Sequence, residues 1–169
     1  ICATVQGAGL AITSLHWLLV SPEGLSITDA DADVRHRTRE VMAALCDLAA
    51  DLGAPVLVHG SPAQRRLPEG REAEAVGWTH EAFAVAARAA EKAGVTYCVE
   101  PLAPPANNNI ETLAQAAALV DAIASPHLRT MLDTSAADGE PAWEAPLPAG
   151  SALTLGPRSL LLLKAPRED

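Results

Sequence analysis

The strongest constraint on the fold is a repeat in which a short apolar segment carries a polar residue and is followed by a helical pattern. The polar residues lie within or at the ends of four such segments, and they are His16, His59, Glu100 and Asp133. They are 43, 41 and 33 positions apart, as in repeated strand–helix units. Such units form parallel sheets with right-handed crossovers, and their strand ends lie on one edge. The sequence therefore predicts an α/β fold of parallel (β/α) units in which these four residues converge.

Apolar patterning places the expected elements along the chain. Strands are expected over residues 10–20, 55–60, 95–100 and 128–134. The first helix is expected to be capped by Thr28 or Asp29 and to end at Gly53; the second runs from about Glu72 to Gly94, and the third begins with a cap at Asn109. The helix positions expected to face the core are Val34, Thr38, Val41, Leu45, Leu48, Leu52, Val76, Phe83, Ala86, Ala87, Ala90, Leu113, Ala116, Val120 and Ile123.

Glu100 is the first functional candidate, because it ends the segment Val95–Leu102 that reads as a buried strand. Strands covered on both faces are usually apolar throughout. An unpaired buried carboxylate would cost several kcal/mol, so Glu100 should be neutral, ion-paired or bound to a metal. The carboxyl ends of parallel strands are also where α/β proteins keep their chemistry. Two imidazoles and two carboxylates at one such edge would suit a divalent metal such as Mn, Mg, Co or Zn.

Composition narrows the class of protein. A chain of 169 residues with 49% hydrophobic residues is long enough for one domain with a sizeable core. Its net charge of −9 argues against a general nucleic-acid binder, which needs a basic face. Three widely spaced cysteines without a CxxC motif, no signal peptide and no apolar run of roughly 20 residues indicate a cytoplasmic protein without a membrane span.

The repeat stops at Gly139. Residues 140–169 contain five prolines and no clear strand–helix unit apart from the short apolar run Ser159–Lys164. We therefore expect one α/β domain over residues 1–139 and an irregular, Pro-rich tail over residues 140–169.

Four motifs in order resemble the xylose isomerase-like TIM-barrel superfamily of sugar (phosphate) isomerases and epimerases, over roughly residues 8–139. They are Ser-Leu-His16-Trp, His-Gly60-Ser-Pro-Ala-Gln-Arg65, Val-Glu100-Pro-Leu and Ser-Pro-His-Leu-Arg-Thr-Met-Leu-Asp133-Thr. The resemblance implies a partial barrel, with about strands three to six of eight. It also implies a divalent metal held by Glu100 and Asp133, which match the family's Glu on the fifth strand and Asp on the sixth.

The implied activity is a metal-dependent isomerase or epimerase reaction on a small-molecule sugar or sugar phosphate, with proton transfer next to a carbonyl through an enediolate. Glu100 would be a metal ligand and one acid/base. The chain departs from the family pattern at Ala106 and Ala136, where relatives often have Glu and His. The family's metal-binding His on strand seven and Glu on strand eight have no evident counterpart. Because of these departures, a truncated, non-catalytic barrel fragment stays open as an alternative. A second alternative is a relative of the zinc-dependent apurinic-site endonucleases, whose His residues on strands three and four match His16 and His59.

Five further residues are candidates for substrate binding. His16 fits a contact to substrate or to a core partner better than a metal ligand, and Trp17 could stack on a sugar face or simply pack in the core. His59 is either a site residue or a hydrogen-bonded imidazole at a strand end. Ser61 and Arg65 could hold an anionic group, although a turn with a solvated Arg fits equally well. A half barrel also leaves apolar surface open, which a homo-oligomer would cover.

Overall fold

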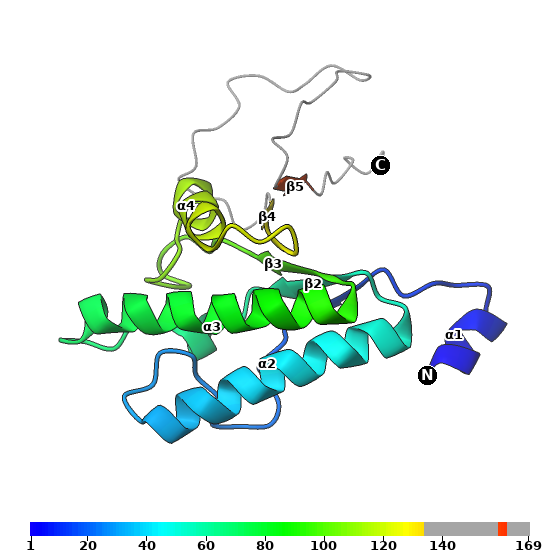
Figure 1. Ribbon diagram of the computed structural model, residues 1–169, viewed down its shortest axis with the longest axis horizontal. Helices are drawn as coiled ribbons and strands as arrows, with labels where there is room; N and C mark the ends of the chain where they lie inside the picture. The colour runs from blue at the N-terminus through cyan, green and yellow to red at the C-terminus, as the bar shows by residue number, and fades with distance from the viewer. Residues whose placement is uncertain (134–158, 162–169) are drawn as a thin grey trace, which may run out of the picture.

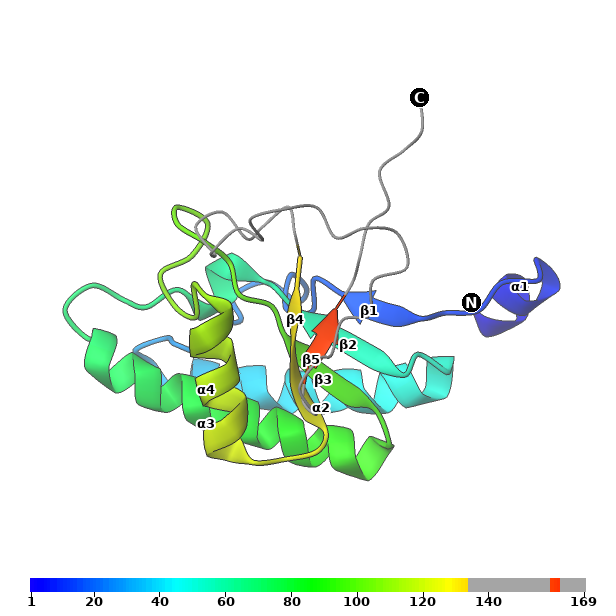
Figure 2. The same cartoon turned by 90° about the horizontal axis from the view of Figure 1, so that it is seen from above.

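The computed structural model describes residues 1–133 and a short strand at 159–161. At its centre is one parallel sheet in the order β1-β2-β3-β4-β5, so each strand lies beside the next one in sequence (Figure 2). The strands are β1 (Ser14–His16), β2 (Val56–His59), β3 (Thr96–Val99), β4 (Leu128–Leu132) and β5 (Ser159–Leu161). The predicted α/β fold is confirmed, and strands added in sequence order are what a TIM barrel requires.

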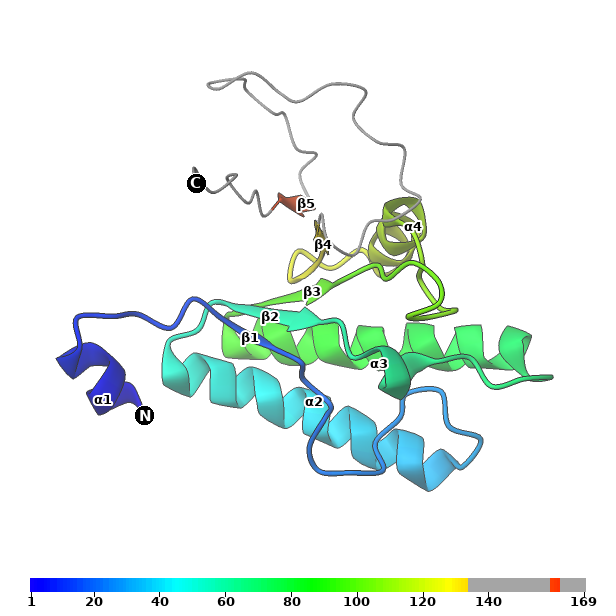
Figure 3. The ribbon, with the colours of Figure 1, turned by 180° about the vertical axis from the view of Figure 1, so that it is seen from behind.

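The long helices cover one side of this sheet. Helices α2 and α3 run side by side beneath the strands, and α4 lies above α3, at the level of β4 (Figure 1). The view from behind shows the same layering, with the short α1 standing away from the body near the N-terminus (Figure 3). The helices are α1 (Cys2–Gly7), α2 (Ala32–Leu52), the 3-10 helix η1 (Pro62–Arg65), α3 (Glu72–Ala93) and α4 (Leu113–Ile123). None of the helices in the described part of the chain is long and apolar enough to cross a bilayer.

The predicted ends of α2 and α3 are confirmed, since Gly53 and Gly94 close them in the left-handed conformation that glycine adopts without strain. The predicted N-caps are wrong. Asp31 caps α2 by accepting a hydrogen bond from the Asp33 amide at 2.8 Å, whereas Thr28 is buried outside the helix. At α4 a reciprocal capping box forms between Thr112 and Gln115, so the cap lies three residues after the expected Asn109.

The buried face of α2 is rotated relative to the predicted one. Met42, Cys46 and Ala49 are fully buried, while the predicted Leu48 is 45% exposed. The small side chains let α2 approach α3, where the Cys46 thiol lies 4.0 Å from the Ala86 carbonyl oxygen. On α3 the predicted face is confirmed except at its first position, because Val76 is 44% exposed.

The first strand is much shorter than expected. Only Ser14–His16 pairs with β2, and Leu10, which should have opened a buried strand, is 65% exposed. Trp17 has a φ of 58°, so the backbone turns out of the strand directly after His16. The strand at 159–161 falls within the apolar run singled out from the sequence; the rest of the predicted tail lies outside the described residues.

The two faces of the sheet have different surroundings. Side chains that alternate along the strands, including Leu57, Tyr97 and Val99, pack into the large core against the helices. On the opposite face Val58, Cys98 and Met131 form a small second cluster. Burial raises the pKa of the Cys46 thiol to about 11 and that of Cys98 to about 12, so both serve as small apolar core residues.

Candidate functional site

Glu100 follows β3 directly and is 4% exposed, as the sequence predicts for a carboxylate at a buried strand end. Its amide donates to the His59 carbonyl at 3.2 Å, which continues the pairing of β3 with β2. By the alternation along β3, its side chain shares a face with Cys98, away from the helices. There Glu100 Oε2 lies 3.1 Å from Nε2 of His16, so the buried carboxylate has a hydrogen-bond partner.

Gly60 makes this contact possible. His16 lies on β1 and Glu100 after β3, with β2 between them, so the two side chains meet across roughly two strand spacings of 4.8 Å. A Cβ at Gly60 would collide with Glu100 Oε2 and would lie 3.6 Å from His16 Nε2. The absence of a side chain at the end of β2 therefore leaves the space that the Glu100 carboxylate occupies.

Asp133 follows β4 as Glu100 follows β3, and these strands are parallel neighbours. Residues two apart along a strand share a face, so Asp133 lies on the same face as Met131, which is also the face of Glu100. Two carboxylates at one strand edge offer the hard oxygen ligands that Mg or Mn prefers and that Zn accepts. Within the described residues, however, no three His, Cys, Asp or Glu side chains gather closely enough to hold one ion. The Glu100 and Asp133 carboxylates could therefore supply only part of the ligands that a divalent metal needs.

His59 lies at the predicted strand end, but its side chain faces the helices, like that of Leu57 two residues before it. Its Nδ1 is 2.8 Å from the Tyr97 hydroxyl, and its ring packs 5.0 Å from that of Phe83. Burial, reinforced by the positive charge of Arg65, lowers the pKa of His59 to about 3. The structure thus brings His16 and Glu100 together but turns the fully buried His59 to the opposite face.

A neutral, buried His59 predicts a pH-dependent stability. The unfolded chain binds a proton at this imidazole below its ordinary pKa of 6.5, whereas the folded chain does so only near pH 3. Stability is therefore complete above pH 6.5 and falls as the pH drops below it, by about 2 kcal/mol between pH 7 and pH 5. Urea unfolding at both pH values should show this loss in wild type and in the exposed control His36→Gln but not in His59→Gln. An equal loss in His59→Gln would contradict the assignment.

Arg65 is buried and does not present its charge to solvent. Its Nε donates to the Gly60 carbonyl at 3.0 Å, and its Nη2 donates to the Glu100 carbonyl at 2.6 Å. Burial lowers the pKa of the guanidinium to about 10 against the opposing effect of Glu100, so it stays protonated at neutral pH. Its role in binding an anionic substrate stays a prediction, while its observed contacts are to the main chain of the site.

The family model described as xylose isomerase-like TIM barrel matches residues 3–158. The chain belongs to this family. The match runs across the predicted domain boundary at residue 139, and that boundary itself stays a prediction. A comparison with curated protein sequences found no match.

Solved structures of the xylose isomerase-like fold confirm the partial barrel. The 3-keto-D-glucoside 4-epimerase from E. coli is 16% identical, with a TM-score of 0.69 over 83% of this chain and 55% of its own. An L-ribulose 3-epimerase is 26% identical, with a TM-score of 0.69 over 83% of this chain and 47% of its own. A family 2 AP endonuclease from Brucella melitensis is 19% identical, with a TM-score of 0.64 over 81% of this chain and 53% of its own. The chain thus spans about half the length of these xylose isomerase-like neighbours.

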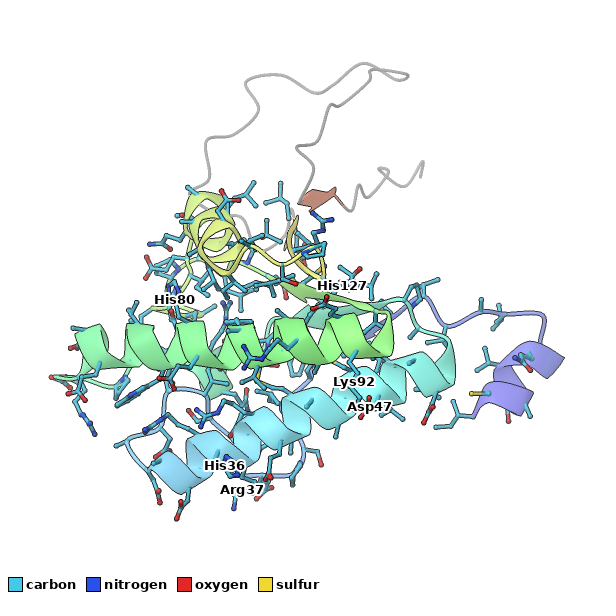
Figure 4. The ribbon with its side chains drawn as sticks, in the orientation of Figure 1. His36, Arg37, Asp47, His80, Lys92 and His127 are labelled. Carbon is cyan, nitrogen blue, oxygen red and sulfur yellow. The ribbon has the colours of Figure 1, made fainter. Side chains whose placement is uncertain are left out.

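The remaining candidates surround the strand ends of this xylose isomerase-like sheet. Trp17 is 63% exposed directly after β1, and its role in stacking on a sugar stays a prediction. Ser61 is buried with a φ of 31°, and its hydroxyl accepts a hydrogen bond from the Leu19 amide at 3.4 Å. His36 and His80 lie on the outside of α2 and α3 (Figure 4). His127 precedes β4 and is partly buried, with Nδ1 2.8 Å from the Val95 carbonyl oxygen.

Sequence reasoning missed the asparagine clamp, which we define as Asn107, Asn108 and Asn109. The clamp joins the loop after β3 to the loop after β2. Asn107 donates to the Pro62 carbonyl at 2.7 Å, Asn108 bonds both the amide and the carbonyl of Leu67, and Asn109 donates to the Arg65 carbonyl at 2.8 Å. The run of three asparagines in a Pro-rich loop was visible in the sequence, but only as a loop signal.

Proposed function

We propose that this chain carries the metal-binding part of a sugar isomerase or epimerase site, acting on a ketose or a related sugar by proton transfer next to a carbonyl. The observation that carries the proposal is the nearly buried Glu100 carboxylate, held against His16 at the strand edge that also ends in Asp133. Family membership and the 26% identity to an L-ribulose 3-epimerase support a sugar as the substrate.

Glu100 and Asp133 would hold the divalent ion, Mn, Mg, Co or Zn, as two carboxylate ligands. When bound, the ion supplies polarisation of the sugar's carbonyl and hydroxyl oxygens as negative charge develops. Glu100 would also exchange the proton at the neighbouring carbon, with its Oε2 oriented by His16 Nε2. Trp17, exposed after β1, would contact a face of the sugar.

Inversion at a sugar carbon needs an acid/base on each face. Glu100 is the acid/base candidate on one face, so we propose that the 169-residue chain supplies that face of the site. We further propose a cytoplasmic protein with three free cysteines and a homo-oligomer that pairs the open sheets. A net charge of −9 does not favour the nucleic-acid substrate of the AP endonuclease branch.

A one-sided site should exchange a proton without inverting the carbon. Ketopentoses, ketohexoses and their phosphates, incubated with the chain and Mn²⁺ in deuterium oxide, should take up deuterium next to the carbonyl. This uptake should be absent without metal and in Glu100→Gln. Mass spectrometry measures the uptake, and chromatography measures any epimer.

Two results would contradict the proposal in different ways. If none of these sugars takes up deuterium in a metal-dependent way, the chain is a non-catalytic barrel fragment and the proposed activity is wrong. Epimer formation by a monomer at ordinary enzyme rates, about 1–1000 per second, would show that the chain holds both acid/base groups. The mass of the protein in solution decides whether the active species is a monomer.

A further inference from the structure

Arg65 has unusual surroundings for a cation. Among the described residues it is one of the largest fully buried side chains. Its Nε and Nη2 donate to the main-chain carbonyls of Gly60 and Glu100, whereas its buried Nη1 has no hydrogen-bond partner among those residues. Burying a guanidinium is costly unless its charge and its donors are matched. The nearby Glu100 carboxylate supplies an opposite charge, and the two carbonyls supply acceptors.

The two carbonyls belong to the residues that decide the geometry of the site. Gly60 directly follows β2 and Glu100 directly follows β3, and the Glu100 carboxylate lies over Gly60 to reach His16. The planar fork of the guanidinium fixes the separation of two acceptors at once, which a single ammonium cannot do. Arg65 therefore links the backbone at Gly60 to the backbone at Glu100. The distance between these two segments determines whether the Glu100 carboxylate can contact His16.

We propose that Arg65 is a positioning residue for Glu100: it holds the ends of β2 and β3 in the one arrangement that lets the carboxylate cross Gly60 and contact His16. The asparagine clamp holds Arg65 in turn. Asn109 Nδ2 donates to the Arg65 carbonyl at 2.8 Å and to the Thr79 hydroxyl at 2.9 Å, which links η1 to α3. The metal-binding consequence of this inference rests on the proposed function, whereas the geometric consequence does not.

The first measurement is the ¹⁵N resonance of the His16 ring, which reports its hydrogen bond to Glu100 without any metal. Protein labelled with ¹⁵N-histidine is compared in wild type, Arg65→Lys, Glu100→Ala and Tyr97→Phe, with His16→Gln for assignment. Arg65→Lys keeps the positive charge but loses the two-point contact. Its His16 Nε2 resonance should move from the wild-type position to that of Glu100→Ala, in which the acceptor of the hydrogen bond is absent.

Tyr97→Phe is the matched control. It removes a buried hydrogen bond from the same strand but on the helix-facing side, where Tyr97 bonds His59. Because this contact is remote from the Glu100 carboxylate, the His16 resonance should stay at its wild-type position even if stability falls. Should Arg65→Lys fail to fold, Asn109→Ala, which removes the support of the Arg65 carbonyl, should shift the resonance in the same direction. A folded variant at either position with a wild-type His16 resonance would overturn the proposal.

The second measurement is Mn²⁺ affinity by calorimetry. Arg65→Lys should bind Mn²⁺ tenfold or more weakly than wild type, in the range of roughly 10–100-fold that loss of an outer partner of a metal ligand typically costs. Tyr97→Phe should bind like wild type. Equal affinity of wild type and Arg65→Lys would overturn the role of Arg65 and leave the proposed function intact. If wild type binds no Mn²⁺, the proposed function fails, and the His16 resonance still decides the role of Arg65.

Discussion

Replacing Glu100 by Gln should weaken Mn²⁺ binding by more than about a hundredfold while the fold is retained. Loss of an outer partner of a metal ligand costs roughly 10–100-fold in affinity, and loss of a charged ligand should cost more. The amide has nearly the same shape as the carboxylate, and its oxygen can still accept a hydrogen bond from His16 Nε2. The change therefore removes the negative charge and leaves the packing at the end of β3 in place.

Calorimetric titration with Mn²⁺ or Zn²⁺ measures this loss. Glu91→Gln is the matched control, because it removes the same charge from an exposed position on α3. It should bind the metal like wild type, and thermal unfolding should confirm that both variants are folded. Equal binding by wild type and Glu100→Gln would remove Glu100 from the metal site.

Replacing Gly60 by Ala should disrupt the site almost as severely, although no charge changes. Gly60 does not occupy the left-handed region that favours glycine, so the backbone itself accepts alanine. The new methyl group would instead collide with Glu100 Oε2 and push the carboxylate away from His16. Because the end of a Glu side chain can turn aside, the loss of stability should be only about 1 kcal/mol, at the low end for overpacking. The loss of Mn²⁺ affinity should be at least tenfold.

A double-mutant cycle isolates the collision. Gly60→Ala is measured in wild type and in Glu100→Ala, where the colliding atoms are gone. Urea unfolding should show that the destabilisation by Gly60→Ala largely disappears in the Glu100→Ala background, because residues in contact are energetically coupled. The same loss of stability in both backgrounds would mean that the methyl group meets something other than Glu100.

The helix boundaries that depend on local sequence patterns were predicted most reliably. Helix α3 begins at Glu72 and ends before Gly94 as predicted, because a long apolar face and a terminal glycine are both local signals. The cap of α4 was also encoded locally, in the Thr112-x-x-Gln115 pattern of a capping box. It was missed because Asn109 is an equally good capping residue, and its amide is instead used in a tertiary contact with Arg65.

Contacts between distant segments could not be predicted in the same way. The sequence predicted the position of His59 at a strand end. It did not predict the direction of the side chain, because β2 is apolar on both faces and nothing in Val56–His59 indicates which face carries the imidazole. Glu100 was identified because a carboxylate in a buried strand is exceptional. Its partner His16 is 84 positions away, and only the strand order places the two side chains above Gly60.

The asparagine clamp has a consequence for how this region can vary among relatives. Its acceptors on the loop after β2 are the carbonyls of Pro62, Arg65 and Leu67, which every amino acid possesses. Substitution at Pro62 or Leu67 would therefore leave the bonds available, whereas the donors depend on asparagine side chains of one length. Apart from Arg65, whose side chain contacts the site, the loop after β2 can therefore diversify, whereas the loop after β3 should keep its three asparagines.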